Sequence, residues 1–176
     1  MKVIVRQGDV LDEIVDVVIC TANPMLRMSG GVNGALLLRG GKAIQSELDA
    51  HLASLRITHV APGTVVRTGP GPLAVKHILH AVGVNVFYES SVDLIQRLLE
   101  AALKEASNLG VRSVATPALA TGYGPLSIAE FGAALKGAIL GEFPGIEELR
   151  VVLRRSDAVD EVSRIVHESG APDRNS

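Results

Sequence analysis

Short runs of β-branched and aliphatic residues alternate along the chain with longer segments in which apolar residues recur at helical spacing. The apolar runs predict strands at 3–5, 15–19, 63–68, 75–82, 111–115 and 149–153. Four of these runs are almost entirely apolar, which is typical of strands buried on both faces of a sheet. The helical spacing predicts helices at 43–55, 92–109, 128–141 and 159–168.

The ends of these segments and the turns between them indicate how the elements are arranged. Ser91 and Ser127 stand where helix N-caps belong, and Glu130 completes a capping box with Ser127. Alternating strands and helices place helices on both faces of a largely parallel sheet. The strands at 63–68 and 75–82 are joined by a Gly/Pro turn too short for a crossover helix, so we expect an antiparallel hairpin there. The predicted fold is α/β, a three-layer α/β/α sandwich with a mixed, roughly six-stranded sheet.

The composition indicates one domain with an aliphatic core. Among the 176 residues, 47% are hydrophobic and 20% are charged, which excludes a disordered chain. Aromatic residues make up only 3%, so aliphatic side chains must fill the core. We expect residues 1–170 to form a single domain and residues 171–176 to form a flexible tail.

The charge balance and the single cysteine limit the classes of partner. Seventeen Lys and Arg residues face 19 Asp and Glu residues, and a net charge of −2 cannot hold a nucleic acid or an anionic membrane by bulk attraction. No apolar run has the length of a signal peptide or a membrane span. Cys20 has no partner for a disulfide, and no Cys/His spacing matches a zinc site. We expect a cytoplasmic protein with no metal or cofactor, and its oligomeric state stays open.

Two glycine-bearing loops, 23–34 and 117–125, directly follow predicted strands. Ligands of open α/β sheets gather beyond the carboxyl ends of the strands. Glycines allow backbone amides to approach an anion closely, and the second loop opens into a predicted helix whose N-terminal dipole favours phosphate. Either loop alone could simply form a tight turn. Two such loops at one sheet edge together predict a diphosphate site.

Familiar phosphate-binding motifs match only in part. Leu36 stands where a Walker A motif needs its first glycine, and Ala43 follows Gly41-Lys42, so the chain is not a P-loop NTPase. The segment 122–127 partly matches a dinucleotide-binding motif, although it lacks the third glycine. Arg154, Arg155 and Ser156 end a later strand, where they could bind the 2′-phosphate of NADP. An NADP-binding Rossmann-like oxidoreductase domain is therefore the alternative hypothesis.

Five stretches of the sequence match motifs of one family in the correct order. They are Gly8-Asp9-Val10, Thr21-Ala22-Asn23, Gly31-Val32-Asn33-Gly34-Ala35, Ile78-Leu79-His80-Ala81-Val82-Gly83 and Ala115-Thr116-Pro117-Ala118-Leu119-Ala120-Thr121-Gly122-Tyr123-Gly124. Taken together they resemble the macro domain family, whose members bind ADP-ribose, and the resemblance covers about residues 3–165. It implies that the chain binds ADP-ribose or related ADP-ribosyl metabolites and adducts.

The resemblance also implies roles for individual residues. Asp9 would accept the adenine amino group or cap a helix, and Asn23 would bond to the distal ribose. Tyr123 would lie against this ribose or pack over the following helix, and Arg154 would stack on adenine or form a solvated strand end. The implied ligand-binding residues are Asp9, Val10, Ala22, Asn23, Ser29, Gly30, Gly31, Val32, Ala118, Ala120, Thr121, Gly122, Tyr123 and Arg154.

The departures from the family pattern concern catalysis. Hydrolytic members of the MacroD type have an aspartate, thought to activate water, at the position of Asn33. An amide cannot act as a general base near neutral pH. The resemblance makes Asn23 and Asn33 the catalytic positions, and any hydrolysis of ADP-ribosyl or O-acetyl-ADP-ribose esters is expected to be weak. A substrate-assisted route remains open, in which a phosphate oxygen of the ligand positions the water.

Three further residues could carry chemistry. Cys20 ends an apolar strand without an adjacent basic residue, so we expect it in the core. His77 and His80 are three positions apart on a strand and must point to opposite faces, so they cannot chelate one metal together. We expect His80 to be buried with its hydrogen bonds satisfied.

Overall fold

Six strands form one mixed sheet in the computed structural model, which describes residues 1–168. They are β1 (Lys2–Gln7), β2 (Val17–Ala22), β3 (Val65–Thr68), β4 (His77–Val82), β5 (Ser113–Thr116) and β6 (Glu148–Leu153). Their order across the sheet is β1-β6-β5-β2-β4-β3, and every neighbouring pair is parallel except the antiparallel pair β3–β4. The predicted mixed sheet and hairpin are confirmed. The predicted tail at 171–176 lies outside the described residues.

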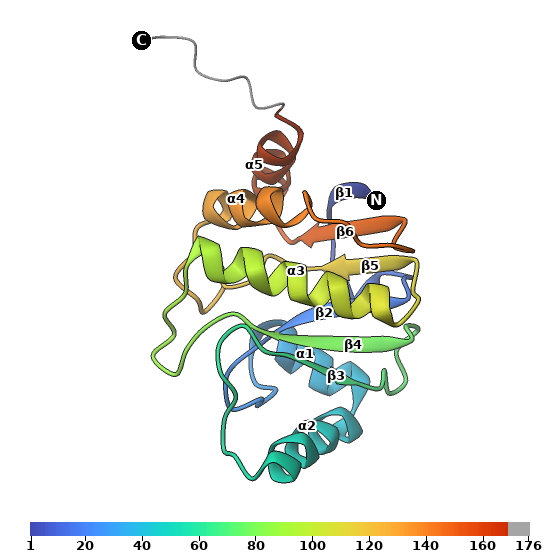
Figure 1. Ribbon diagram of the computed structural model, residues 1–176, viewed down its shortest axis with the longest axis vertical. Coiled ribbons are helices and arrows are strands. Elements are labelled where there is room, and N and C mark those ends of the chain that lie inside the picture. Colours follow the sequence, from blue (N-terminus) through green and yellow to red (C-terminus); the bar gives the residue numbers. More distant parts are fainter. Residues whose placement is uncertain (169–176) are drawn as a thin grey trace.

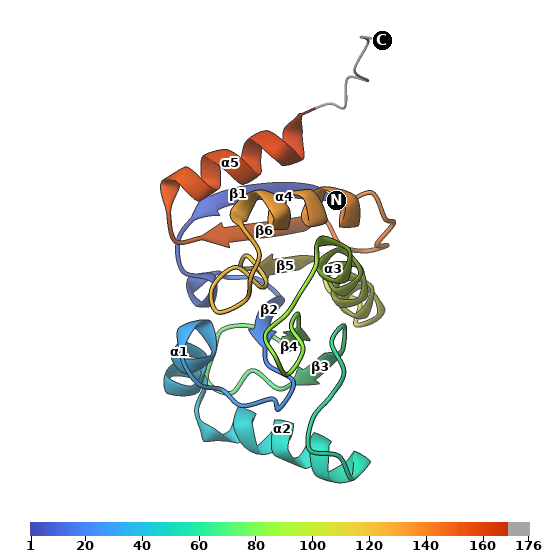
Figure 2. The same cartoon turned by 90° about the vertical axis from the view of Figure 1, so that its left-hand side faces the viewer.

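Helices cover both faces of this sheet. α1 (Gly31–Gly40) and α2 (Lys42–Leu55) lie on one side, and α3 (Val92–Asn108), α4 (Ile128–Ala138) and α5 (Ser156–His167) lie on the other (Figures 1 and 2). None of the helices in the described part of the chain is long and apolar enough to cross a membrane. The predicted three-layer sandwich is confirmed.

Alternating residues of the central strands build the two halves of the core. In β2, Val17 and Ile19 pack in the cluster beneath α3 and α4, whereas Val18 and Cys20 pack in the cluster beneath α1 and α2. This alternation follows from the two-residue period of a strand. Every side chain in the middle of β2 is therefore buried, as its apolar sequence predicts.

One helix that forms part of the site was not predicted. The segment 23–34 was expected to be a loop, but α1 begins inside it at Gly31, and a short 3-10 helix (Val10–Asp12) also follows β1. Three of the ten residues of α1 are glycines, which lower helix propensity and interrupt the apolar spacing. Leu36 in the same helix is fully buried and anchors it to the sheet. Similarly, α5 begins at Ser156, three residues before the predicted start.

The parallel strands leave two chemically different edges. Their carboxyl ends lie toward the left of Figure 1 and face the viewer in Figure 2. At the opposite edge, the Asp16 carboxylate accepts hydrogen bonds from Lys76 Nζ (2.8 Å) and from the amides of Arg112 (2.8 Å) and Ser113 (3.2 Å). These bonds lower the pKa of Asp16 to about 2. Asp16 therefore ties the amino ends of β2, β4 and β5 together, away from the edge that carries the glycine loops.

His80 in β4 is fully buried but only half satisfied, contrary to expectation. Its Nε2 lies 2.9 Å from the Thr68 hydroxyl, while its Nδ1 has no hydrogen-bond partner among the described residues. The Thr68 hydroxyl donates its own proton to the Gly69 carbonyl, so Nε2 must carry the imidazole proton. Nδ1 is thus a bare acceptor in the core, and burial lowers the pKa of His80 from 6.5 to about 4.

This lowered pKa predicts a loss of stability in weak acid. A folded-state pKa below the unfolded value means that the unfolded chain binds the proton more tightly. The contribution of His80 is complete above pH 6.5 and is lost as the pH falls toward 4, by about 3 kcal/mol in all. Denaturant unfolding of His80→Gln across this range should therefore show a flatter pH dependence than the wild type. Parallel curves for the two proteins would contradict this assignment.

Candidate functional site

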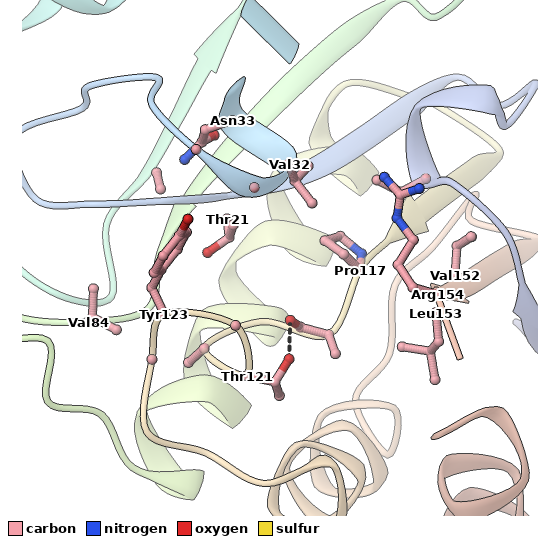
Figure 3. A pocket seen from close by; sticks show the side chains of 18 of the residues that line it. Thr21, Val32, Asn33, Val84, Pro117, Thr121, Tyr123, Val152, Leu153 and Arg154 are labelled. Carbon is pink, nitrogen blue, oxygen red and sulfur yellow. Dashed lines mark hydrogen bonds between the residues drawn. The ribbon is translucent and has the colours of Figure 1, made fainter. Parts of the chain in front are cut away.

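A cavity of about 440 Å³ opens at the carboxyl edge of the sheet (Figure 3). This volume lies in the usual range of small-molecule sites. Residues from the ends of β1, β2, β5 and β6 form its floor, including Gly8, Thr21, Pro117 and Leu153. The two glycine loops, one now seen to continue into α1, lie across this floor.

The N-terminus of α1 borders the cavity without a side-chain cap. Gly30, Gly31, Val32 and Asn33 all line the cavity, and Gly30 at the N-cap position provides no side-chain hydrogen bond. No acidic residue lies in the first turn of α1. Its free amides and positive dipole end are thus available to an anion in the cavity.

The N-terminus of α4, by contrast, is already occupied. Ser127 Oγ accepts from the amide of Glu130, and the Glu130 carboxylate accepts from the amide of Ser127 at 2.8 Å. The carboxylate of this capping box neutralises the end of the helix that we expected to bind phosphate. The N-terminus of α1 has no such side-chain cap, so its amides are more open to a ligand than those of α4.

The loop between β5 and α4 keeps a tight shape that exposes its backbone to the cavity. Ala120 has a φ of 59°, and its carbonyl accepts from the amide of Leu126 at 3.0 Å. A Cβ at Gly124 would lie 2.4 Å from the same carbonyl oxygen, so only glycine fits there. Left-handed backbone at a residue other than glycine costs about 1 kcal/mol, and such strain is concentrated at functional sites.

Tyr123 connects the two sides of the cavity. Its hydroxyl lies 3.0 Å from the point where a Cβ of Gly30 would stand, so its ring reaches from the β5–α4 loop to the start of α1. Figure 3 shows this ring beside Val84, at the end of the cavity farthest from Arg154. The ring is nevertheless 76% exposed, so the predicted packing over α4 is not its main environment.

The other end of the cavity combines apolar side chains with arginine. Arg154 Nη2 lies 3.0 Å from Asp9 Oδ2, although these residues are far apart in the sequence. The second oxygen of Asp9 accepts from the amide of Leu11 at 3.0 Å, so Asp9 caps the 3-10 helix. Asp9 does not line the cavity but fixes Arg154, which does. A contact between Asp9 and adenine stays a prediction.

The side chains of the predicted catalytic positions Asn23 and Asn33 differ in their hydrogen bonds. The Asn23 amide donates to the carbonyl of Arg27 (2.9 Å) and accepts from its backbone amide (3.1 Å), so it shapes the loop before α1. One N–H of Asn23 remains for a ligand. Asn33, at the third position of α1, is 8% exposed, and its Oδ1 has no partner among the described residues.

Cys20 lies beneath this site but does not reach it. Its side chain is fully buried, and burial raises the pKa of the thiol to about 12. The thiol therefore stays protonated and unreactive at neutral pH. Within residues 1–168, no group of three or more His, Cys, Asp or Glu side chains is placed to hold a metal ion.

The cavity brings together every predicted ligand-binding residue except Asp9, and also the predicted catalytic positions Asn23 and Asn33. Several contributors from the strand ends and helix starts were not in the implied ligand-binding set, although some of them belong to the motifs or to the alternative site: Gly8, Thr21, Val84, Tyr88, Pro117, Gly124, Ile128, Val152, Leu153, Arg155 and Ala158. Most of them could have been found from the rule that ligands sit beyond strand carboxyl ends. Tyr88 carries no such signal because it lies six residues beyond β4.

The charges around the cavity are of one sign. Arg154 and Arg155 are the charged residues that line it, and no carboxylate does so within the described chain. Arg155 forms an ion pair with Asp157, and Arg154 is held by Asp9. Open helix amides in a cavity that no described carboxylate lines favour an anionic ligand, although both arginines already have carboxylate partners.

Comparisons with known proteins agree with this geometry. A sequence model of the family described as Macro domain matches residues 19–132, which include both glycine loops. A macro domain-containing protein of Streptomyces nogalater is 33% identical over 159 residues, which cover 90% of this chain and 88% of the relative. The Oceanobacillus iheyensis macrodomain with ADP superimposes with a TM-score of 0.84 at 22% identity, covering 92% of this chain and 88% of that one. The Trypanosoma brucei macrodomain in complex with ADP-ribose gives a TM-score of 0.80 at 20% identity, covering 93% and 68% of the two chains.

Proposed function

Because this chain belongs to the macro domain family, we propose that it binds ADP-ribose, free or attached to a protein, in the cavity at the carboxyl edge of the sheet. The observation that carries the proposal is the open N-terminus of α1, which lies across the cavity from the strained loop at Ala120. Two sets of backbone donors facing one cavity suit a diphosphate. The ADP-ribose in the related T. brucei complex supports the same ligand class.

The remaining parts of the cavity suit the rest of this ligand. Val10, Val152 and Leu153 supply an apolar end for the adenine base, and Arg154 lies beside it (Figure 3). A guanidinium can stack on the face of a base. The distal ribose would then lie at the opposite end, between Tyr123 and Asn33, where amide and hydroxyl groups can bond to its hydroxyls.

We propose binding as the main activity, with at most slow hydrolysis of ADP-ribosyl or O-acetyl-ADP-ribose esters. No carboxylate lines the described cavity, and Asn33 offers an amide where a general base would be needed. A phosphate oxygen of the bound ligand could still position a water molecule. Such a route lacks the large contribution of a protein base, so turnover should be slow.

The NADP-binding alternative is not favoured. Its partial motif at 122–127 forms the β5–α4 loop, and the helix that follows is closed by its own capping box. Arg154, which was expected to meet a 2′-phosphate, is paired with Asp9. Family membership and the sheet order instead fit a macro domain.

Titration calorimetry tests the proposed ligand directly. We expect ADP-ribose to bind more tightly than AMP, because AMP lacks the second phosphate and the distal ribose. NADP should also bind more weakly, because a nicotinamide and a 2′-phosphate must be accommodated in addition. Equal affinities for the three compounds, or no binding of ADP-ribose, would refute the proposal.

A further inference from the structure

Three of the rings of this aromatic-poor chain are exposed, and two of them line the cavity. The sequence contains five aromatic residues, and three of them, Phe87, Tyr88 and Tyr123, are 80%, 44% and 76% exposed. Val86, which precedes Phe87 in the chain, is also 45% exposed. We call Phe87, Tyr88 and Tyr123 the aromatic rim. Exposed apolar side chains gathered at one place are typical of an interaction site.

The loop that carries Phe87 and Tyr88 is held in shape by its own hydrogen bonds. Asn85 Oδ1 accepts from the amides of Phe87 (2.9 Å) and Glu89 (3.0 Å), while its Nδ2 donates to Glu89 Oε2 (2.7 Å). Ser90 Oγ donates to the Gly83 carbonyl at 2.6 Å and closes the base of the loop. The rings are therefore presented on an ordered loop, which reduces the entropy lost when a partner binds.

The aromatic rim is continuous with the cavity at one end only. Tyr88, Tyr123 and Val84 all line the cavity, and Figure 3 shows Val84 and Tyr123 together at the end opposite Arg154. In the proposed binding mode, this end holds the distal ribose. A group attached to that ribose would leave the cavity across the aromatic rim.

The charges near the aromatic rim indicate what kind of group on the distal ribose it could contact. Neither residues 83–91 nor residues 121–125 contain a lysine or arginine, and Glu89 is the only carboxylate in these two segments. A nucleic acid strand needs cations along its backbone. Aromatic side chains without cations are instead typical of the centre of a protein–protein interface.

We propose that the aromatic rim contacts the polypeptide to which ADP-ribose is attached, by packing against apolar side chains that flank the modified residue. This inference rests on the proposed function. It assigns the exposed loop at 84–89 a role in selecting among ADP-ribosylated proteins. Free ADP-ribose would not reach Phe87, because that ring does not line the cavity.

The test compares free ADP-ribose with two peptides ADP-ribosylated at the same residue, one with leucine and the other with glycine on both sides. By calorimetry, the wild type should bind the leucine peptide more tightly than free ADP-ribose. Phe87→Ala should weaken the leucine peptide about fivefold and leave free ADP-ribose unchanged. Leu140→Ala, at an 83% exposed position just beyond the far end of α4, is the matched control and should change neither affinity.

The outcomes separate this inference from the proposed function. If free ADP-ribose does not bind, the proposed function fails and this inference fails with it. If free ADP-ribose binds but the leucine peptide gains nothing over it, or Phe87→Ala has no effect on that peptide, only the rim assignment is wrong. Two further ligands test the rim assignment. It would also be wrong if NAD⁺ or an ADP-ribosylated oligonucleotide bound more tightly than free ADP-ribose and this difference depended on Phe87.

Discussion

Replacing Val32 by aspartate is expected to lower the affinity for ADP-ribose about 100-fold without unfolding the protein. Val32 is the second residue of α1, and its side chain points into the cavity from the open helix end (Figure 3). A carboxylate there would repel the diphosphate by about 2 to 4 kcal/mol at a separation of roughly 4–6 Å. The same charge would stabilise the helix N-terminus, so the melting temperature should hold or rise.

Val32→Asn is the matched control because it has nearly the same shape as the aspartate variant but no charge. It should lose less than about tenfold in affinity, and the gap between the two variants should narrow as salt screens the repulsion. Calorimetry at two ionic strengths measures both effects. Equal losses for the two variants would show that charge at α1 does not matter and that the diphosphate lies elsewhere.

The second large effect is a gain of activity. Asn33→Asp should raise the rate of ADP-ribose release from an ADP-ribosylated protein about 100-fold over the wild type, because a positioned general base contributes roughly that much or more. The side chain at position 33 already lies beside the expected place of the distal ribose, with a buried oxygen that has no partner among the described residues. The substitution changes the chemistry of this group and keeps its shape.

Asn33→Ala separates base catalysis from a merely enlarged cavity. It should release ADP-ribose no faster than the wild type in the same chromatographic assay, and O-acetyl-ADP-ribose should give the same ranking. Rapid release by the wild type would show that another group performs the catalysis. A rise in the alanine variant equal to that in the aspartate variant would lead to the same conclusion.

The sequence predicts the sheet well because its strands carry a strong local signal. The runs at 15–19, 75–82 and 149–153 are mostly apolar, which favours buried strands, and the Gly/Pro turn before 75 leaves no room for a crossover. Each of them contributes a strand to the sheet, although β2 and β4 begin two residues later than predicted, and the hairpin is antiparallel as expected. Both glycine loops were also located correctly at the carboxyl edge.

The site was harder to predict because its details depend on contacts between distant segments. The glycines at the start of α1 weaken its helical pattern, so the sequence predicts a loop where the open helix end borders the cavity. The pairing of Asp9 with Arg154 joins residues at opposite ends of the chain, and no local pattern indicates it. Tyr88 belongs to no motif, and its left-handed backbone (φ 62°) depends on the loop that Asn85 organises.

The pairing of β1 with β6 determines when the protein can become functional during synthesis. β1 is an outer strand of the sheet, and its partner β6, paired in the register from Lys2↔Glu148 to Gln7↔Leu153, is the last of the six strands to be made. The end of the cavity proposed for adenine is lined by Gly8 and Val10, which follow β1, and by Val152 and Arg154, at the end of β6. A growing chain therefore has no complete cavity until β6 has left the ribosome and closed on β1. A ligand that contacts both segments would stabilise this closure, because it would bind the form in which the two strands are joined.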